Sequence, residues 1–195
     1  MPPGPRILAF AGSTRDDSLN KKVLRVAVKA AEAEGAEVTR IDLRSYALPL
    51  YDGDLERREG LPERALALRM LFLAHQGLLI AAPEYNGSVS AVLKNTIDWL
   101  SRPIEGETEY SLTCFRGKVA GILSASPGPF GGLRGLAHLR DILTVIGVIV
   151  VPEQWAVRSA SADLADGDVL RDPLDQRVTE RVARRLVEVV RRVAV

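Results

Sequence analysis

The amino-acid sequence predicts an α/β protein in which a five-stranded parallel sheet is covered by helices on both faces. Five short runs suit buried strands, and one of them, residues 77–82 (GLLIAA), is apolar without interruption. Segments with helical periodicity lie between these runs, and the spacing over residues 7–43 is that of a βαβ unit. The predicted strands are residues 7–11, 38–43, 77–82, 119–123 and 148–151.

The first half of the chain contains one predicted βαβ unit and one segment without regular structure. The loop 12–20 joins the first strand to a helix that Gly35 ends as a C-cap. Residues 44–61 contain prolines, glycines and several charges, and we expect an irregular surface excursion there, to which the sequence assigns no role. Pro62 suits the first position of the next helix, which runs to about residue 75.

The stretch from Pro83 to Ser88 is the centre of the prediction, because it follows the most apolar strand. Pro83 ends that strand, since it lacks the N–H group that the sheet requires. A helix follows from Ser88 or Ser90, either of which suits an N-cap, and Trp99 adds bulk to its apolar face. Open α/β sheets bind ligands in such loops at the carboxyl ends of their strands.

The second half of the chain repeats the strand and helix alternation. Residues 103–117 are expected to form a loop of unassigned role, and residues 124–132 form a loop of small residues after the fourth strand. Helices are predicted over residues 133–146 and 174–193. Right-handed crossovers favour the flavodoxin-like strand order in a three-layer sandwich, and residues 1–195 are expected to form a single domain.

Composition and charge exclude several classes of function. The 195 residues are 47% hydrophobic and 26% charged, as in ordinary globular proteins, and the net charge is +1. The basic residues are dispersed, so we expect no nucleic-acid partner. No run is long enough for a membrane span or a signal peptide, and Cys114 is the one cysteine, so the predicted location is cytoplasmic.

The loop 12–20 has the side chains of a phosphate site, although it lacks both the Walker and the dinucleotide-binding glycine patterns. Its hydroxyl, amide and guanidinium donors precede a helix N-terminus, which favours anions. An ordinary N-cap loop explains the same residues equally well. The phosphate interpretation requires Asp16 and Asp17 to face solvent, because their charges repel an anion. The candidate donors are Ser13, Arg15, Ser18 and Asn20.

Other reactive residues form no recognisable constellation. His75 and His138 have no partners at metal-ligand spacing, so no metal site is predicted, and Cys114 is interpreted as a structural thiol. Gly131 and its neighbours suit either a close approach to a ligand or the packing of a loop on a helix. An enzyme with this layout needs a cofactor, and no side chain is assigned as catalytic.

Two stretches together resemble a known family. Residues 12–20 (GSTRDDSLN), and residues 83–102 with the runs PEYNGS and LKNTIDWLSR, are similar to the NAD(P)H-dependent FMN reductases, which include azo-dye, quinone and chromate reductases. The resemblance covers roughly residues 6–151. One departure is the segment from Pro103 to Arg116, which is longer than the usual link.

The resemblance implies a cofactor and its contacts. FMN is the implied cofactor, with its phosphate held by Ser13, Arg15, Ser18 and Asn20. The backbone of residues 83–87 borders the isoalloxazine ring, and Tyr85 shapes the pocket; the residues concerned are Pro83, Glu84, Tyr85, Asn86 and Gly87. Ser124, Ser126 and the region of Gly131 close the other side of the flavin.

The implied function is an oxidoreductase that transfers hydride from NADPH or NADH to FMN and then to a small acceptor. A quinone, an azo dye, free flavin and chromate are the implied acceptors, and a homodimer or homotetramer is the implied assembly. The alternative is a flavodoxin-like electron carrier that does not oxidise pyridine nucleotides. The strongly acidic surface usual for such carriers is absent at a net charge of +1.

Overall fold

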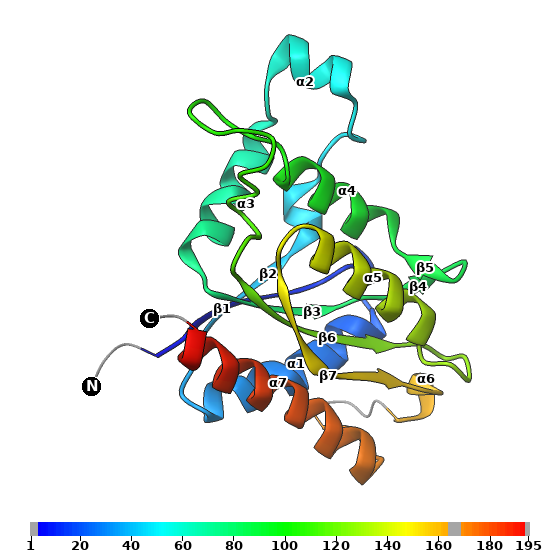
Figure 1. Ribbon diagram of the computed structural model, residues 1–195. Coiled ribbons are helices and arrows are strands. Elements are labelled where there is room, and N and C mark those ends of the chain that lie inside the picture. Colours follow the sequence, from blue (N-terminus) through cyan, green and yellow to red (C-terminus); the bar gives the residue numbers. More distant parts are fainter. Residues whose placement is uncertain (1–3, 164–168, 194–195) are drawn as a thin grey trace.

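A computed structural model describes residues 4–163 and 169–193, and its sheet is the predicted one (Figure 1). Five parallel strands lie in the order β2-β1-β3-β6-β7, which is the flavodoxin-like order expected from the sequence. The strands are β1 (Arg6–Ala11), β2 (Glu37–Asp42), β3 (Gly77–Ala81), β6 (Val119–Ala125) and β7 (Ile149–Val157).

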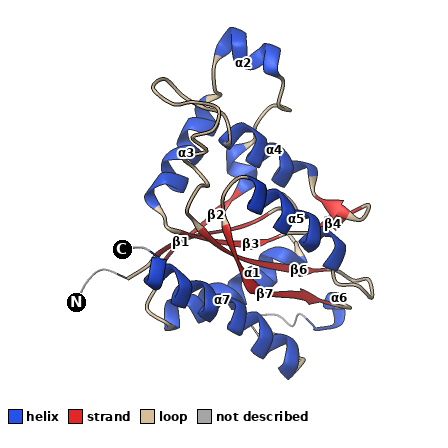
Figure 2. Ribbon diagram, in the orientation of Figure 1, coloured by secondary structure: helices blue, strands red, loops and turns tan. Residues whose placement is uncertain are grey.

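Helices cover both faces of the sheet, as Figure 2 shows. One face packs against α1 and α7, and the other against α3, α4 and α5, which gives two separate apolar cores. The helices are α1 (Leu19–Ala33), the 3-10 helix η1 (Leu43–Tyr46), α2 (Gly53–Glu59), α3 (Glu63–Ala74), α4 (Ala91–Leu100), α5 (Leu133–Val145), α6 (Ala160–Asp163) and α7 (Pro173–Val193). None of them, over the described residues, is long and apolar enough to cross a bilayer.

Two strands extend past their predicted ends by more than one residue, and the other boundaries agree within one residue. The fourth strand continues to Ala125, so Ser124 belongs to β6 and not to a loop. The fifth strand continues past Pro152 to Val157, with a register shift opposite residues 120–122. A proline is tolerated there because β7 is an edge strand, whose outer N–H groups need no partner in the sheet.

The excursion 44–61 is not irregular, as the sequence suggested, but contains η1 and the projecting helix α2. Helix α4 anchors it: the side chains of Asn95 and Trp99 each donate a hydrogen bond of 2.8 Å to the carbonyl of Pro49. Trp99 is fully buried and lies edge-on to the ring of Tyr51. The Trp99 side chain is therefore buried within the chain and is not available for contact with a second subunit.

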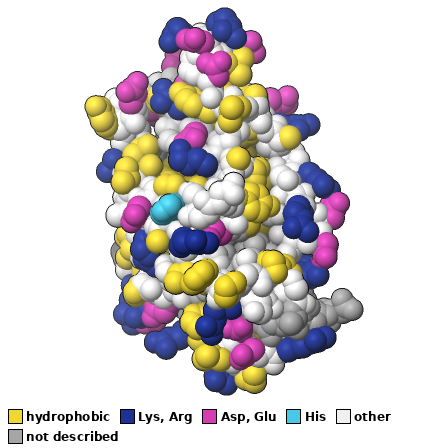
Figure 3. Space-filling model, turned by 90° about the vertical axis from the view of Figure 1, so that its right-hand side faces the viewer, with side chains coloured by type: hydrophobic (Ala, Val, Ile, Leu, Met, Phe, Trp, Pro, Cys, Tyr) yellow, Lys and Arg dark blue, Asp and Glu magenta, His cyan; other side chains and the backbone are white. Residues whose placement is uncertain are grey.

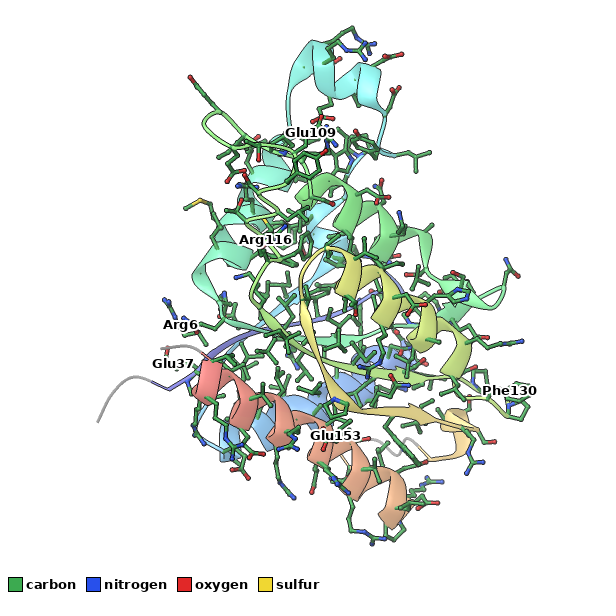
Figure 4. All side chains as sticks on the ribbon, in the orientation of Figure 1. Arg6, Glu37, Glu109, Arg116, Phe130 and Glu153 are labelled. Carbon is green, nitrogen blue, oxygen red and sulfur yellow. The ribbon has the colours of Figure 1, made fainter. Side chains whose placement is uncertain are left out.

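The long loop 103–117 runs beside α3 and is held by a buried arginine. Arg69 is 3% exposed and pairs with Glu107, while its Nη2 donates to Thr113 Oγ1 at 2.8 Å. Figure 4 marks Arg116 and Glu109 along this loop, the second where the loop approaches the base of α2. The loop thus lies far from the carboxyl ends of the strands, which meet at the opposite edge of the sheet (Figure 1).

Candidate functional site

The loop that follows β1 (residues 12–20, the first loop) is built around the start of α1. Ser18 is the N-cap, and its Oγ accepts the N–H of Lys21 at 3.4 Å. The backbone N–H groups of Leu19 and Asn20 belong to the first helical turn, which has no intrahelical acceptors for them. Ser13 and Ser18 are 3% and 4% exposed. Buried hydroxyls beside free amides at a helix N-terminus form a site for an anion.

Both acidic residues of the first loop are turned outward and paired. Asp16 pairs with Arg44, and this hydrogen bond and charge lower the pKa of the Asp16 carboxyl. Asp17 lies 2.5 Å from the ammonium of Lys22, which lowers its pKa in the same way. In contrast, no described residue forms a hydrogen bond or ion pair with the Arg15 guanidinium. The phosphate interpretation required Asp16 and Asp17 to face solvent, and both side chains do.

Asn20 has a structural task that the sequence did not reveal. Its side-chain amide donates to the carbonyl of Ala125 at 2.9 Å and accepts the N–H of the same residue at 3.0 Å. These bonds join the start of α1 to the end of β6, across 105 residues of sequence. The side chain of Asn20 therefore fixes one wall of the site, and its backbone N–H is what remains for a ligand.

Residues 84–89 form a small hairpin rather than the expected open loop. Strands β4 (Glu84–Tyr85) and β5 (Ser88–Val89) pair antiparallel, with Asn86 and Gly87 as the turn at φ angles of 51° and 79°. Both turn residues are left-handed, which is the geometry of a type I′ turn. The Asn-Gly pair was the signal for this hairpin. It follows Pro83, holds Tyr85 half exposed, and precedes Ser90, the observed N-cap of α4.

Glu84 ties the hairpin to the start of α5. Its carboxylate accepts the N–H of Gly135 at 3.0 Å and the Nε of Arg134 at 2.9 Å, and its side chain is 8% exposed. Burial alone raises the pKa of Glu84, but these two donors outweigh it and hold the pKa below its usual value. The carboxylate replaces the side-chain cap that Gly132 cannot supply to α5. The Glu84 carboxylate thus already has its hydrogen-bond donors within the chain.

The third part of the site is the segment 126–132 between β6 and α5 (the third segment). Ser126 begins it, and its Oγ accepts the N–H of Gly128 at 3.2 Å. A Cβ on Gly132 would lie 1.9 Å from Ser124 Oγ, and a Cβ on Gly131 would lie 2.7 Å from the carbonyl of Ala156. Both glycines are therefore required for packing of the segment, whatever ligand binds. Ser124 Oγ is buried and has no hydrogen-bond partner among the described residues.

These three parts meet in one pocket at the carboxyl ends of β1, β3 and β6. Its volume of about 80 Å³ is below the several hundred Å³ usual for a whole cofactor, so it encloses only an anchoring group. Asn86, Gly87, Ser124 and Gly131 lie outside its lining. The lining residues are Ser13, Arg15, Ser18, Leu19, Asn20, Pro83, Glu84, Tyr85, Ala125, Ser126 and Pro127.

The donor set of this pocket suits the phosphate of FMN. Hydroxyls, free amides and an unpaired guanidinium face the pocket, and the neighbouring carboxylates are neutralised by Arg44, Lys22 and Arg134. The hairpin and the third segment extend from it as open walls on which a larger ring system can lie. Cys114 is buried and is not among the residues that line the pocket, and burial raises the pKa of its thiol to about 11.

Comparison with known proteins identifies the family to which the chain belongs. Residues 5–162 match the NADPH-dependent FMN reductase family. The chain is 34% identical over 179 residues to a Pseudomonas aeruginosa NAD(P)H-dependent FMN reductase, with 91% of each protein covered. It is 38% identical over 147 residues to an Escherichia coli quinone reductase, covering 75% of this chain and 73% of the relative.

A solved structure supports the same relationship. The flavoenzyme NAD(P)H:(acceptor) oxidoreductase from Paracoccus denitrificans superposes with a TM-score of 0.80 at 27% identity. The superposition covers 97% of this chain and 98% of the other. The resemblance in fold therefore extends over the whole sandwich and not only over the two recognised stretches.

Proposed function

Because the chain belongs to the NADPH-dependent FMN reductase family, we propose that the pocket at the first loop holds the phosphate of FMN. The protein is an NAD(P)H-dependent flavin oxidoreductase. FMN held there would supply the redox chemistry, namely acceptance of a hydride from NADPH or NADH and transfer of two electrons to a second substrate. The observation that carries the assignment of the site is the unpaired Arg15 beside Ser13 and Ser18, with both acidic neighbours turned away.

Each wall has a distinct task in this proposal. Ser13, Arg15, Ser18 and the first amides of α1 bind the phosphate, while Asn20 holds the wall that faces them. Backbone groups of the hairpin border the ring, and Tyr85 covers part of it. Glu84 keeps the hairpin in place through Arg134 and Gly135. These residues bind and orient, and none is needed to transfer a proton or form a bond.

The proposed acceptors are small oxidants, with quinones first because an E. coli relative is a quinone reductase. Free flavin, azo dyes and chromate are the other candidates. Steady-state turnover with NADPH and NADH against a quinone, free FMN and an azo dye tests this directly. NAD(P)H oxidation also separates the proposal from the electron-carrier alternative, because a carrier leaves both nucleotides unchanged.

We further infer that the chain is one domain and assembles as a homodimer or homotetramer in the cytoplasm. An interface is supported by the outward face of α3, where Leu66, Met70 and Leu73 are 42%, 68% and 44% exposed. Contiguous exposed apolar side chains of this kind commonly mark subunit contacts. The one cysteine, a buried free thiol, is in keeping with a reducing compartment.

A further inference from the structure

Arg134 is an unusually well fixed surface arginine. Its Nε and Nη2 both donate to Glu84 Oε1, at 2.9 and 2.5 Å, which aligns one edge of the guanidinium. Its plane lies over the ring of Phe130, with 5.3 Å between the guanidinium carbon and the ring centroid. No described residue accepts a hydrogen bond from Nη1, and 62% of the side chain is exposed. Glu84 therefore holds the edge that carries Nε and Nη2, and the edge that carries Nη1 is left for another acceptor.

The carboxylate that pairs with Arg134 is buried, and the guanidinium is the exposed member of this ion pair. Glu84 is only 8% exposed and lies beneath the arginine, so the group presented outward is the cation. An arginine held in this way has already lost most of its rotational freedom, which reduces the entropy cost of binding an anion. Planar donors of this kind suit the paired oxygens of a carboxylate or sulfonate.

Three exposed apolar residues are Phe130, on which this cation lies, and the chain neighbours of Arg134 and Glu84. Phe130 is 59% exposed, Leu133, the neighbour of Arg134 in α5, is 50% exposed, and Tyr85, the neighbour of Glu84 in β4, is 49% exposed. Figure 4 shows Phe130 at the outer tip of the third segment. Apolar and basic patches lie next to each other on this side of the molecule (Figure 3). The combination of aromatic surface and one cation suits an aromatic ring with an acidic substituent.

The patch borders the proposed FMN site, because Glu84 and Tyr85 also line the pocket. A substrate that exchanges electrons with the flavin has to approach across this rim. We propose that Arg134 determines acceptor specificity by selecting aromatic acceptors with an anionic substituent, such as sulfonated or carboxylated quinones. The inference rests on the proposed function. It assigns to Arg134 a role in binding the second substrate, and not in holding FMN.

The test compares a naphthoquinone with its sulfonate as acceptors for the FMN-loaded enzyme. The measured quantity is the ratio of kcat/KM for the sulfonate to kcat/KM for the neutral quinone, which cancels general losses of fold or cofactor. In Arg134→Met this ratio should fall about tenfold, the size of one charged hydrogen bond at a partly exposed site. Arg134→Lys should recover part of it. Arg64→Met removes the same charge from α3, remote from the pocket, and should leave the ratio unchanged.

A binding measurement provides a readout that does not depend on turnover. Calorimetric titration of the oxidised holoenzyme with naphthalene sulfonate should show binding that weakens in Arg134→Met. The affinity for naphthol, which lacks the sulfonate, should be the same in both proteins. An unchanged ratio, or equal losses for both acceptors, would overturn the inference. A fall in kcat/KM for NADPH with an unchanged acceptor ratio would instead assign Arg134 to the nucleotide. If wild type oxidises neither NADPH nor NADH with any acceptor, the proposed function itself fails.

Discussion

Single residues in the pocket divide into those that hold the chain together and those left free for a ligand. The side-chain oxygens of Asn20 and Glu84 accept hydrogen bonds within the chain, so these side chains position the walls of the pocket and do not bind the cofactor directly. Arg15 is the opposite case, since no described residue pairs with its guanidinium. Sequence alone cannot make this distinction, because both kinds of residue occur in the same motifs.

Arg15 should contribute affinity through the phosphate of FMN and nothing else. Arg15→Ala should weaken FMN binding by roughly tenfold to a hundredfold, which corresponds to one charged hydrogen bond, and should leave riboflavin binding nearly unchanged. Fluorescence titration of the apoprotein with both flavins measures this. Lys29→Ala, on the same helix but away from the pocket, serves as the control. Equal losses for FMN and riboflavin would show that Arg15 does not contact the phosphate.

Glu84 should make the stability of the fold depend on acid pH. Its folded-state pKa lies below the unfolded value of about 4.3, so its contribution is present above that pH and lost as pH falls through the folded pKa. Urea unfolding should therefore show Glu84→Gln destabilised at pH 7, by about 1 kcal/mol or more. The difference from wild type should shrink at pH 3. A difference that is the same at both pH values would contradict the assigned charge.

At the scale of elements, the hairpin is the part most dependent on backbone geometry. Gly87 has a φ of 79° and open space around it. A side chain there would strain the left-handed backbone conformation but would not clash with a neighbour. Gly87→Ala should destabilise the apoprotein by about 1 kcal/mol and weaken FMN binding, because the turn sets the position of the hairpin amides. Gly53→Ala, at the start of α2, is the matched control and should be neutral or stabilising. Thermal unfolding with and without FMN distinguishes the two effects.

The strands were predictable because each is marked by apolar residues that lie close together in the sequence, but several other elements were not predictable. Helix α2 has no buried residue, so it leaves no helical pattern of apolar positions. Pro152 signalled an end to the fifth strand, and only the edge position of β7 explains why the strand continues. The turn at Asn86 and Gly87 was readable, but flanking strands of two residues carry no alternation.

The site was predictable in its residue types and not in its connections. The first loop and the run 83–88 were recognisable from short motifs, and the structure brings most of them to one pocket. The bonds from Glu84 to Arg134 and from Asn20 to Ala125 span 50 and 105 residues, and no local pattern announces them. Gly131 and Ser124 were assigned to the flavin because their loop was. In the structure Gly131 packs closely against the carbonyl of Ala156, and Ser124 Oγ has no hydrogen-bond partner among the described residues.

At the scale of the whole molecule, the apolar face of α3 predicts self-association. Met70→Glu places a charge in the centre of that face and should shift the mass measured by light scattering from an oligomer toward the single chain. The corresponding change at an exposed apolar residue elsewhere, Val145→Glu in α5, should leave the mass unchanged. A wild-type mass equal to one chain at micromolar concentration, with FMN bound, would refute the proposed assembly.

FMN bound in this pocket is expected to be reduced by a pyridine nucleotide. The most direct test mixes the FMN-loaded protein anaerobically with one equivalent of NADPH, and separately of NADH, and follows the visible absorbance of the flavin. We predict that the absorbance is lost with at least one nucleotide and returns when a quinone is added. A protein that binds FMN tightly and keeps its oxidised spectrum with both nucleotides would not be an NAD(P)H-dependent flavin reductase.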